Sequence, residues 1–264
     1  MKCVLFKALW VLLTFTPQFV WAQDKLFHVS VGGGFDVLNY TQEIGRSFPG
    51  GSVMIEGQYQ HFFLEKLGYA VGVQLSYLTA GYNLKEEDER ISEEESVVFF
   101  DGVTEKQRFF QVDVPVGLYL RLDISRNSQF FVGAGPKISF PLISRYEYLS
   151  GSVFWGEDTN EDLSDVQKTK GKNSIDTEWL LYSLYIDMMW SFVLNNSSAL
   201  HIGTYFSYGL NDLVSNHDAQ LGIDKKSILN TTLTSRVLPI CFGLKVGVTV
   251  PLQKRVRRLA FDGF

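Results

Sequence analysis

Apolar and polar residues alternate strictly along several strand-length stretches of the chain. The stretches 200–210 and 238–248 show this most clearly, with Leu, Ile, Val and Phe on one face and Gly, Ser, Lys and His on the other. A period of two residues is typical of a β-strand with one apolar face. The pattern therefore predicts a β-sheet protein, whose class depends on the solvent that meets the apolar face.

The same alternation predicts eight strands. We expect them near residues 26–38, 52–62, 68–80, 109–122, 129–142, 179–194, 199–211 and 237–250. Each is long enough for the ~9–11 residues that a tilted strand needs to cross a bilayer. Short turns alternate with long loops, and the loops cover residues 39–51, 81–108, 143–178 and 212–236. Such alternation is typical of a closed barrel that has its turns and both termini at one end and its loops at the other.

Glycine and charged residues share one face of the predicted strands. Glycine weakens a strand in general, but on the concave side of a narrow barrel it relieves crowding. We therefore assign this face to the lumen and the apolar face to the outside, an arrangement that requires lipid around the barrel. The fold class predicted is all-β, an eight-stranded antiparallel up-and-down transmembrane β-barrel. The alternative is a water-soluble barrel of the lipocalin type, with the apolar face inside around a ligand.

The lumen face carries charges of both signs. An eight-stranded barrel is only wide enough for side chains to fill it, and buried charges need ion-pair or hydrogen-bond partners. We therefore predict a polar network that plugs the lumen in a structural role, and we predict no catalytic residues, cofactor or metal. The predicted network consists of Asp36, Glu56, Asp113, Arg121, Lys137, Asp187, His201 and Lys245.

The two ends of the chain predict export. Residues 1–22 combine a positive start, a short apolar core and a small-residue cleavage site, as in a secretory signal peptide. Cleavage is expected between Ala22 and Gln23, which leaves 23–264 as one outer-membrane domain with a basic periplasmic tail at 251–264. Only Cys241 remains in the mature chain, so no intrachain disulfide is available. The formal net charge of −5 argues against a nucleic-acid partner.

Three further features offer chemistry outside the predicted network. His28 and Ser30 share a strand face, as a nucleophilic pair would, but they point into the lumen and away from lipid. The neighbours His217 and Asp218 in the last long loop suggest a hydrolytic dyad only weakly. An acidic run at residues 86–95 offers carboxylates to a divalent cation, although runs of like charge are more often simply solvated.

Four segments carry a family likeness that extends over the whole mature chain. They are FHVSVGGGF at 27–35, FQVDVPVGLYL at 110–120, FVGAGP at 131–136 and GLKVGV at 243–248. With these segments the chain resembles the PorT-like outer-membrane β-barrel family, small barrels akin to the OmpA and OmpX type. The resemblance implies an outer-membrane barrel but no single activity, since some relatives are accessory parts of secretion machinery. It implies no functional residue.

These observations predict a non-enzymatic outer-membrane protein with a structural, adhesion or accessory role. The expected partners are outer-membrane lipid and a larger envelope complex, such as a secretion complex. Two alternatives stay open. One is a barrel enzyme that acts on lipid or peptide, and the other is a channel for small solutes.

Overall fold

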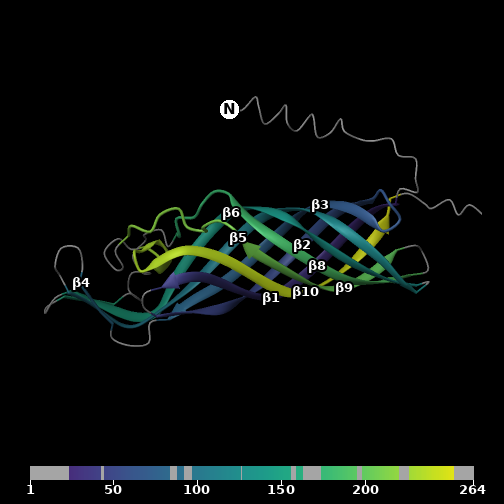
Figure 1. Ribbon diagram of the computed structural model, residues 1–264. Coiled ribbons are helices and arrows are strands. Elements are labelled where there is room, and N and C mark those ends of the chain that lie inside the picture. The colour runs from purple at the N-terminus through teal and green to yellow at the C-terminus, as the bar shows by residue number, and fades with distance from the viewer. Residues whose placement is uncertain are drawn as a thin grey trace, which may run out of the picture.

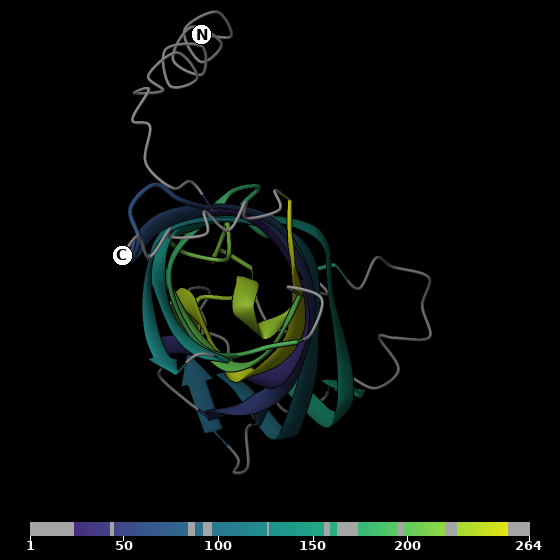
Figure 2. The same ribbon diagram turned by 90° about the vertical axis from the view of Figure 1, so that its right-hand side faces the viewer.

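The computed structural model describes residues 24–42, 45–83, 88–91, 97–125, 127–155, 159–162, 174–194, 198–219 and 226–252. Among the described strands, eight close into an antiparallel ring, which confirms the predicted fold class (Figures 1 and 2). In ring order they are β1 (Asp24–Gln42), β2 (Arg46–Phe62), β3 (Leu67–Asn83), β5 (Val97–Ser125), β6 (Ser128–Trp155), β8 (Leu181–Val193), β9 (Ala199–Gly209) and β10 (Thr234–Pro251). The first and last strands pair with each other and close the barrel.

The connections fall at two ends, as the sequence predicts. The strand ends joined by the short connections from β2 to β3, from β5 to β6 and from β8 to β9 lie at the end of the barrel where the described chain starts and stops, and we call this the turn end (Figure 1). The opposite end, where the longer connections lie, is called the loop end. The predicted signal peptide at 1–22 and residues 253–264 of the predicted tail lie outside the described residues. In the part of the chain that the structure covers, no helix is long and apolar enough to cross a membrane.

The outer surface of the barrel carries a continuous band of exposed apolar side chains, which we call the belt. At the same levels the inward-facing side chains are buried and many of them are polar. This sidedness is the one that a hydrocarbon solvent requires, because apolar surface of this extent is not tolerated in water. Members of the belt include Phe27, Val31, Phe35, Val53, Ile55, Val73, Leu75, Leu118, Leu120, Leu184, Ile186, Trp190, Ile202, Leu244 and Val248.

Two strands are about twice as long as predicted. The strand β5 has 29 residues and β6 has 28, so both continue beyond the belt at the loop end. We call residues 97–109 of β5 and 143–155 of β6 the extension. Charged side chains such as Arg108 and Glu147 face outward, whereas Tyr146 and one carboxylate, Glu105, are buried. The prediction of loops over these residues was wrong, because the two-residue alternation persists there with charged residues on the outward face, where the belt has apolar ones.

Two short strands widen the extension into a sheet. The strand β4 (Asp88–Ile91) pairs with β5, and β7 (Thr159–Asp162) pairs with β6. The resulting order is β4, β5, β6 and β7, and this sheet projects beyond the ring of strands at the loop end (Figure 1).

The last predicted loop does not stay outside the barrel but folds into its mouth. The short 3-10 helix η1 (Ile228–Asn230) is buried, and the Ser227 side chain caps it by accepting a hydrogen bond from the Leu229 backbone N–H. Figure 2 shows this yellow-green segment inside the ring. It packs into an apolar group, the mouth cluster, that includes Leu38, Leu78, Tyr82, Val103, Phe109, Tyr146, Tyr148, Ile175, Leu213, Val214, Ile228, Leu229, Leu233 and Val237.

Candidate functional site

The structure places all eight residues of the predicted network inside the barrel. Each is at most 7% exposed. They are not joined into one continuous network of direct contacts. They form separate groups at different levels, built around Lys245, Asp113, Asp36, Arg121 and His201.

The group around Lys245 crosses the lumen. The Lys245 ammonium lies 2.7 Å from a carboxylate oxygen of Asp187 and 3.2 Å from one of Glu56. The Tyr119 hydroxyl donates to Asp187 at 2.7 Å, and the Ser30 hydroxyl donates to Glu56 at 3.2 Å. These five side chains come from β10, β8, β2, β5 and β1, so this ion-pair centre links strands on different sides of the ring.

The other buried carboxylates are held by neutral donors. Asp113 accepts hydrogen bonds from the Ser76 hydroxyl at 2.6 Å and from the Gln74 amide at 3.1 Å. Asp36 accepts one from the Cys241 thiol at 2.8 Å. Both oxygens of Asp113 are satisfied, because the Gln111 amide donates to the second one at 2.8 Å. Asp36 is satisfied at one oxygen only, and its Oδ2 is buried without a partner, although most buried polar groups in proteins have one.

Lys137 differs from Lys245 because it makes no ion pair with any described residue. Its side chain borders three small cavities in the lumen, each with room for about one water molecule. The cavities are too small to form an aqueous pore at this level.

The turn end is closed by Arg121. Its guanidinium lies 2.8 Å from the Asp24 carboxylate and also stacks over the Phe62 ring, with 4.7 Å to the ring centroid. Phe62 in turn packs edge-to-face against Phe131 at 5.8 Å between centroids. The ion pair and the aromatic pair together fill the lumen beside the short turns.

The pair His28 and Ser30 is not arranged for catalysis. His28 Nδ1 lies 3.1 Å from the Thr249 hydroxyl and the ring packs against His201 at 4.9 Å, whereas Ser30 donates to Glu56. Because imidazole and hydroxyl have different partners, and both are buried in the lumen, the geometry of a base beside its nucleophile is absent here.

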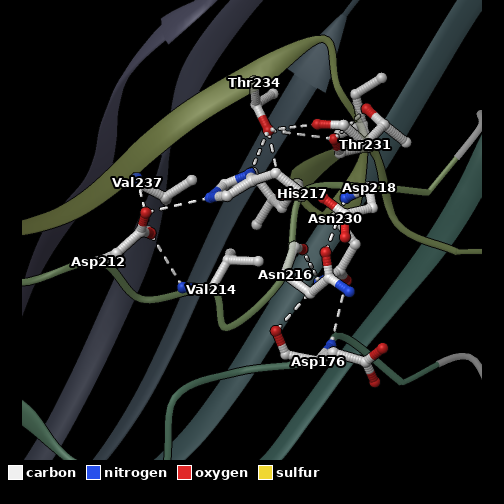
Figure 3. A network of polar contacts seen from close by, with 12 residues as sticks. Asp176, Asp212, Val214, Asn216, His217, Asp218, Asn230, Thr231, Thr234 and Val237 are labelled. Atoms are coloured by element: carbon white, nitrogen blue, oxygen red, sulfur yellow. Dashed lines mark hydrogen bonds and ion pairs between the residues drawn. The ribbon is translucent and has the colours of Figure 1, made fainter.

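Another histidine, His217, lies in a polar network at the mouth, shown in Figure 3. His217 Nε2 is 3.1 Å from the Asp212 carboxylate, and its Nδ1 is 3.4 Å from the Thr234 hydroxyl. The histidine therefore pairs with Asp212 and not with the predicted neighbour Asp218, whose backbone N–H donates to Asn216. Asp212 lies five residues before His217, so adjacency in the sequence pointed to the wrong carboxylate.

The order Asp212, His217, Thr234 has the form of a hydrolase triad, but its surroundings indicate a structural role. Thr234 is 3% exposed, and its hydroxyl lies 3.1 Å from the Leu229 carbonyl and 3.3 Å from the Ile228 carbonyl. A nucleophile must reach a substrate carbon, and this hydroxyl is directed into the buried 3-10 turn. The network therefore fastens the inserted loop to the start of β10.

Glu105 is a buried carboxylate that the sequence did not single out. It accepts hydrogen bonds from the Ser227 hydroxyl at 2.5 Å, the Ile228 backbone N–H at 2.8 Å and the Gln107 amide at 2.8 Å. Complete burial raises the pKa of Glu105 to about 7, against the lowering effect of these hydrogen bonds. It lies in the extension, beyond the belt, and anchors the inserted loop to β5.

The acidic run at residues 86–95 falls for the most part outside the described residues, so its expected solvation or cation binding stays a prediction. Within the described ranges, no group of three or more His, Cys, Asp or Glu side chains is placed to hold a metal ion.

Comparison with known proteins gives one family and several similar folds. A family model described as outer membrane protein beta-barrel domain matches residues 21–215. Among solved structures, the chain is similar to Neisserial surface protein A, with 12% identity over 85% of this chain and 96% of that one at a TM-score of 0.36. It is also similar to OprG from Pseudomonas aeruginosa, with 10% identity over 84% and 94% at a TM-score of 0.43. Ail from Yersinia pestis has 11% identity over 86% and 99% at a TM-score of 0.33. No curated protein sequence matches the chain.

Proposed function

Because this chain belongs to the outer membrane protein beta-barrel domain family, we propose that it is a non-enzymatic barrel acting through its surface outside the cell. Its place is the outer membrane. The role is structural, adhesive or accessory to a larger envelope complex. By the topology of such barrels, short turns face the periplasm and longer loops face the exterior, so the loop end is the outward end.

The observation that carries this proposal is the filling of the barrel at two levels. Within the belt, Lys245, Asp187 and Glu56 meet in the lumen. At the loop end, Ile228 and Leu229 of the inserted segment are fully buried in the mouth cluster. A barrel filled in this way supports a role on the surface and speaks against a path for solutes.

The projecting sheet supplies a surface for such a role. It extends beyond the loop end, and its edge strands β4 and β7 each have a partner on one side only in the described structure (Figure 1). An exposed edge offers unpaired backbone N–H and C=O groups, which a partner protein recognises by adding a strand. This surface fits an accessory or adhesive contact.

Planar-bilayer recording with the purified chain tests the closed barrel. We expect no steady conductance above the bare bilayer, because charged and apolar side chains fill the lumen. Steady single-channel steps would overturn the proposal in favour of a channel. In the same preparation, hydrolysis of lipid or peptide substrates that is lost in His217→Ala would favour an enzyme instead.

The partner surface is tested by affinity purification from detergent-solubilised membranes. The test variant replaces residues 84–96, and with them β4, by a short Gly-Ser turn, which leaves the ladder of β3 and β5 in place. We expect a partner that co-purifies in stoichiometric amount with the full chain and not with this variant. Recovery of the full chain alone would contradict an accessory role and leave an independent barrel.

A further inference from the structure

A groove of about 750 Å³ opens on the outer wall of the barrel at the loop end. It lies where β6 passes the segment 174–177, which runs alongside it through a backbone hydrogen bond from Ile175 to Ser144. Arg108, Leu142 and Arg145 are among its lining residues. Arg108 lies between the buried Gln107 and Phe109, and Arg145 is exposed next to the buried Tyr146, so both side chains face outward, away from the mouth cluster.

The charges in this groove are arranged unfavourably for the protein alone. Arg108 and Arg145 stand directly opposite each other in the ladder of β5 and β6. Like charges in directly opposite positions destabilise a strand pair. Glu147 forms an ion pair with Arg108, but Arg145 has no ion-pair partner among the described residues. The groove therefore holds an uncompensated positive charge.

The groove also has an apolar part, beside the polar residues Ser144, Ser174 and Thr177. Leu142 and Ile143 line it and are 58% and 48% exposed. Trp179, two residues beyond the lining residue Thr177, is 73% exposed. Exposed tryptophan is typical of the boundary between hydrocarbon and water, so this groove lies at the outer edge of the membrane.

We propose that the groove binds a lipid of the outer leaflet through its anionic phosphate headgroup. Arg108 and Arg145 hold the phosphate, and Leu142 and Ile143 contact the beginning of an acyl chain. Guanidinium groups bind phosphate through paired charge-assisted hydrogen bonds, which explains why two of them face each other without a second carboxylate. The inference rests on the proposed orientation, in which the loop end is outside.

The groove's two-part lining selects this occupant over a soluble anion. A free phosphate ion would use the two arginines but not the exposed leucine and isoleucine below them. A lipid uses both, and its position is set in advance because the belt already lies in the bilayer. The probes are therefore phosphatidylglycerol, phosphatidylcholine with the same acyl chains, and inorganic phosphate.

Native mass spectrometry of the full chain, released from micelles containing each probe, measures the binding. We expect phosphatidylglycerol to bind about tenfold more tightly than phosphatidylcholine, and Arg145→Gln to remove this preference, a loss that matches ~1.4 kcal/mol. Arg46→Gln, at another exposed position on β2 at the loop end, should keep it. The heat-dependent mobility of each variant in SDS gels shows whether the barrel is folded.

Three results would overturn this inference. One is equal binding of both lipids, and another is an unchanged preference in the variant Arg145→Gln that is folded. The third is full displacement of phosphatidylglycerol by millimolar inorganic phosphate, which would make the groove a site for a free anion. None of these results changes the conductance or partner experiments above, so the two proposals fail separately.

Discussion

The strands β5 and β6 run through both the belt and the extension, but the kind of side chain on each face differs between the two regions. In the belt, Leu118 faces outward and Asp113 inward. In the extension, Arg108 faces outward and Tyr146 inward. The backbone pairing continues through both regions, with local irregularities such as the one between Phe110 and Gln111.

The strand pairing is the same in both regions, so the difference shows that the surrounding solvent decides which face of a strand carries the apolar side chains. Hydrocarbon accepts the apolar face of the belt, which leaves polar side chains for the lumen. Water surrounds the extension, and there the hydrophobic effect drives aromatic and aliphatic side chains into the interior. One barrel thus keeps most of its buried charges in its membrane part and most of its buried apolar side chains in its outer part, where Glu105 is the buried carboxylate.

The two interiors are also held together differently. In the belt, apolar contacts with neighbouring strands compete with equally apolar lipid, so burial gives little driving force. Ion pairs and hydrogen bonds, such as those of Lys245, have to specify the lumen. In the mouth cluster, the burial of residues such as Leu229 and Tyr82 supplies the stabilisation directly.

The largest effect is expected where the polar interior is broken. Lys245→Met leaves Glu56 and Asp187 buried without their cation, and the free energy of unfolding should fall by about 3–5 kcal/mol. Urea unfolding of the protein folded into lipid vesicles, followed by tryptophan fluorescence, measures it. The matched change Lys106→Met in the extension, at a half-buried outward position, should cost less than about 1 kcal/mol. Equal losses of unfolding free energy in the two variants would mean that the Lys245 charge in the lumen is not needed for stability.

A pair of leucine substitutions tests the solvent on the outer face directly. Leu244 in the belt is 64% exposed and Leu149 in the extension is 53% exposed, so they differ in their surroundings more than in their exposure. Leu244→Arg should lower the free energy of unfolding by about 2–4 kcal/mol, because arginine is then placed in hydrocarbon. Leu149→Arg should change it by no more than about 0.5 kcal/mol. Similar values for the two variants would contradict the division into belt and extension.

Much of the belt could be predicted from the sequence, because its apolar faces and glycine-rich faces alternate in phase over eight segments. The lumen residues follow from the same alternation, so Glu56 and Lys245 could be placed inside before their contacts were known. Which of them touch depends on the stagger between strands. Alternation alone does not specify the register between neighbouring strands, so the separation of Asp113 from the Lys245 group was not predicted.

The extension and the mouth could not be predicted from the same alternation, because strands were expected only where the apolar face is directed outward. Residues 143–155 keep the two-residue period, but Arg145 and Glu147 occupy the outward face, so the strand looked like a loop. The inserted segment at 226–233 has neither period, and its burial arises from long-range packing against β5 and β6. The partner of His217 was missed for a local reason, since the chain between Asp212 and His217 folds back and brings the Asp212 carboxylate to the imidazole.

The buried Glu105 makes the stability of the outer part of the barrel depend on pH. The pKa of Glu105 is about 7 in the folded chain, against an ordinary value of 4.5. Between pH 4.5 and pH 7 the folded state binds more protons than the unfolded state. The free energy of unfolding therefore falls as pH rises through this range, by at most about 3 kcal/mol in total. The loss is absent below pH 4.5 and complete above pH 7. Unfolding at pH 5 and pH 8 should show this dependence in the wild type and not in Glu105→Gln.

A control for this pH dependence is Glu147→Gln, which removes a half-buried carboxylate that pairs with Arg108 in the same region. This variant should keep the fall in stability between pH 5 and pH 8, because Glu105 is unchanged in it. If Glu105→Gln kept the fall as well, the pH dependence would have to come from other groups and Glu105 would not be the anchor of the inserted loop.

The smallest effect is expected at the polar network of the mouth, where a single neutral hydroxyl is involved. Thr234→Val keeps the shape of the side chain but removes its hydrogen bonds to the Leu229 carbonyl and to His217. The loss should be about 1 kcal/mol, the net value of an ordinary hydrogen bond, and Thr104→Val on the outward face should cost less. Hydrogen exchange at the Thr231 amide, which donates to the Ile228 carbonyl, should accelerate in Thr234→Val alone. A loss of several kcal/mol would show instead that the loop is held in the mouth mainly by polar contacts, and not by burial of its apolar side chains.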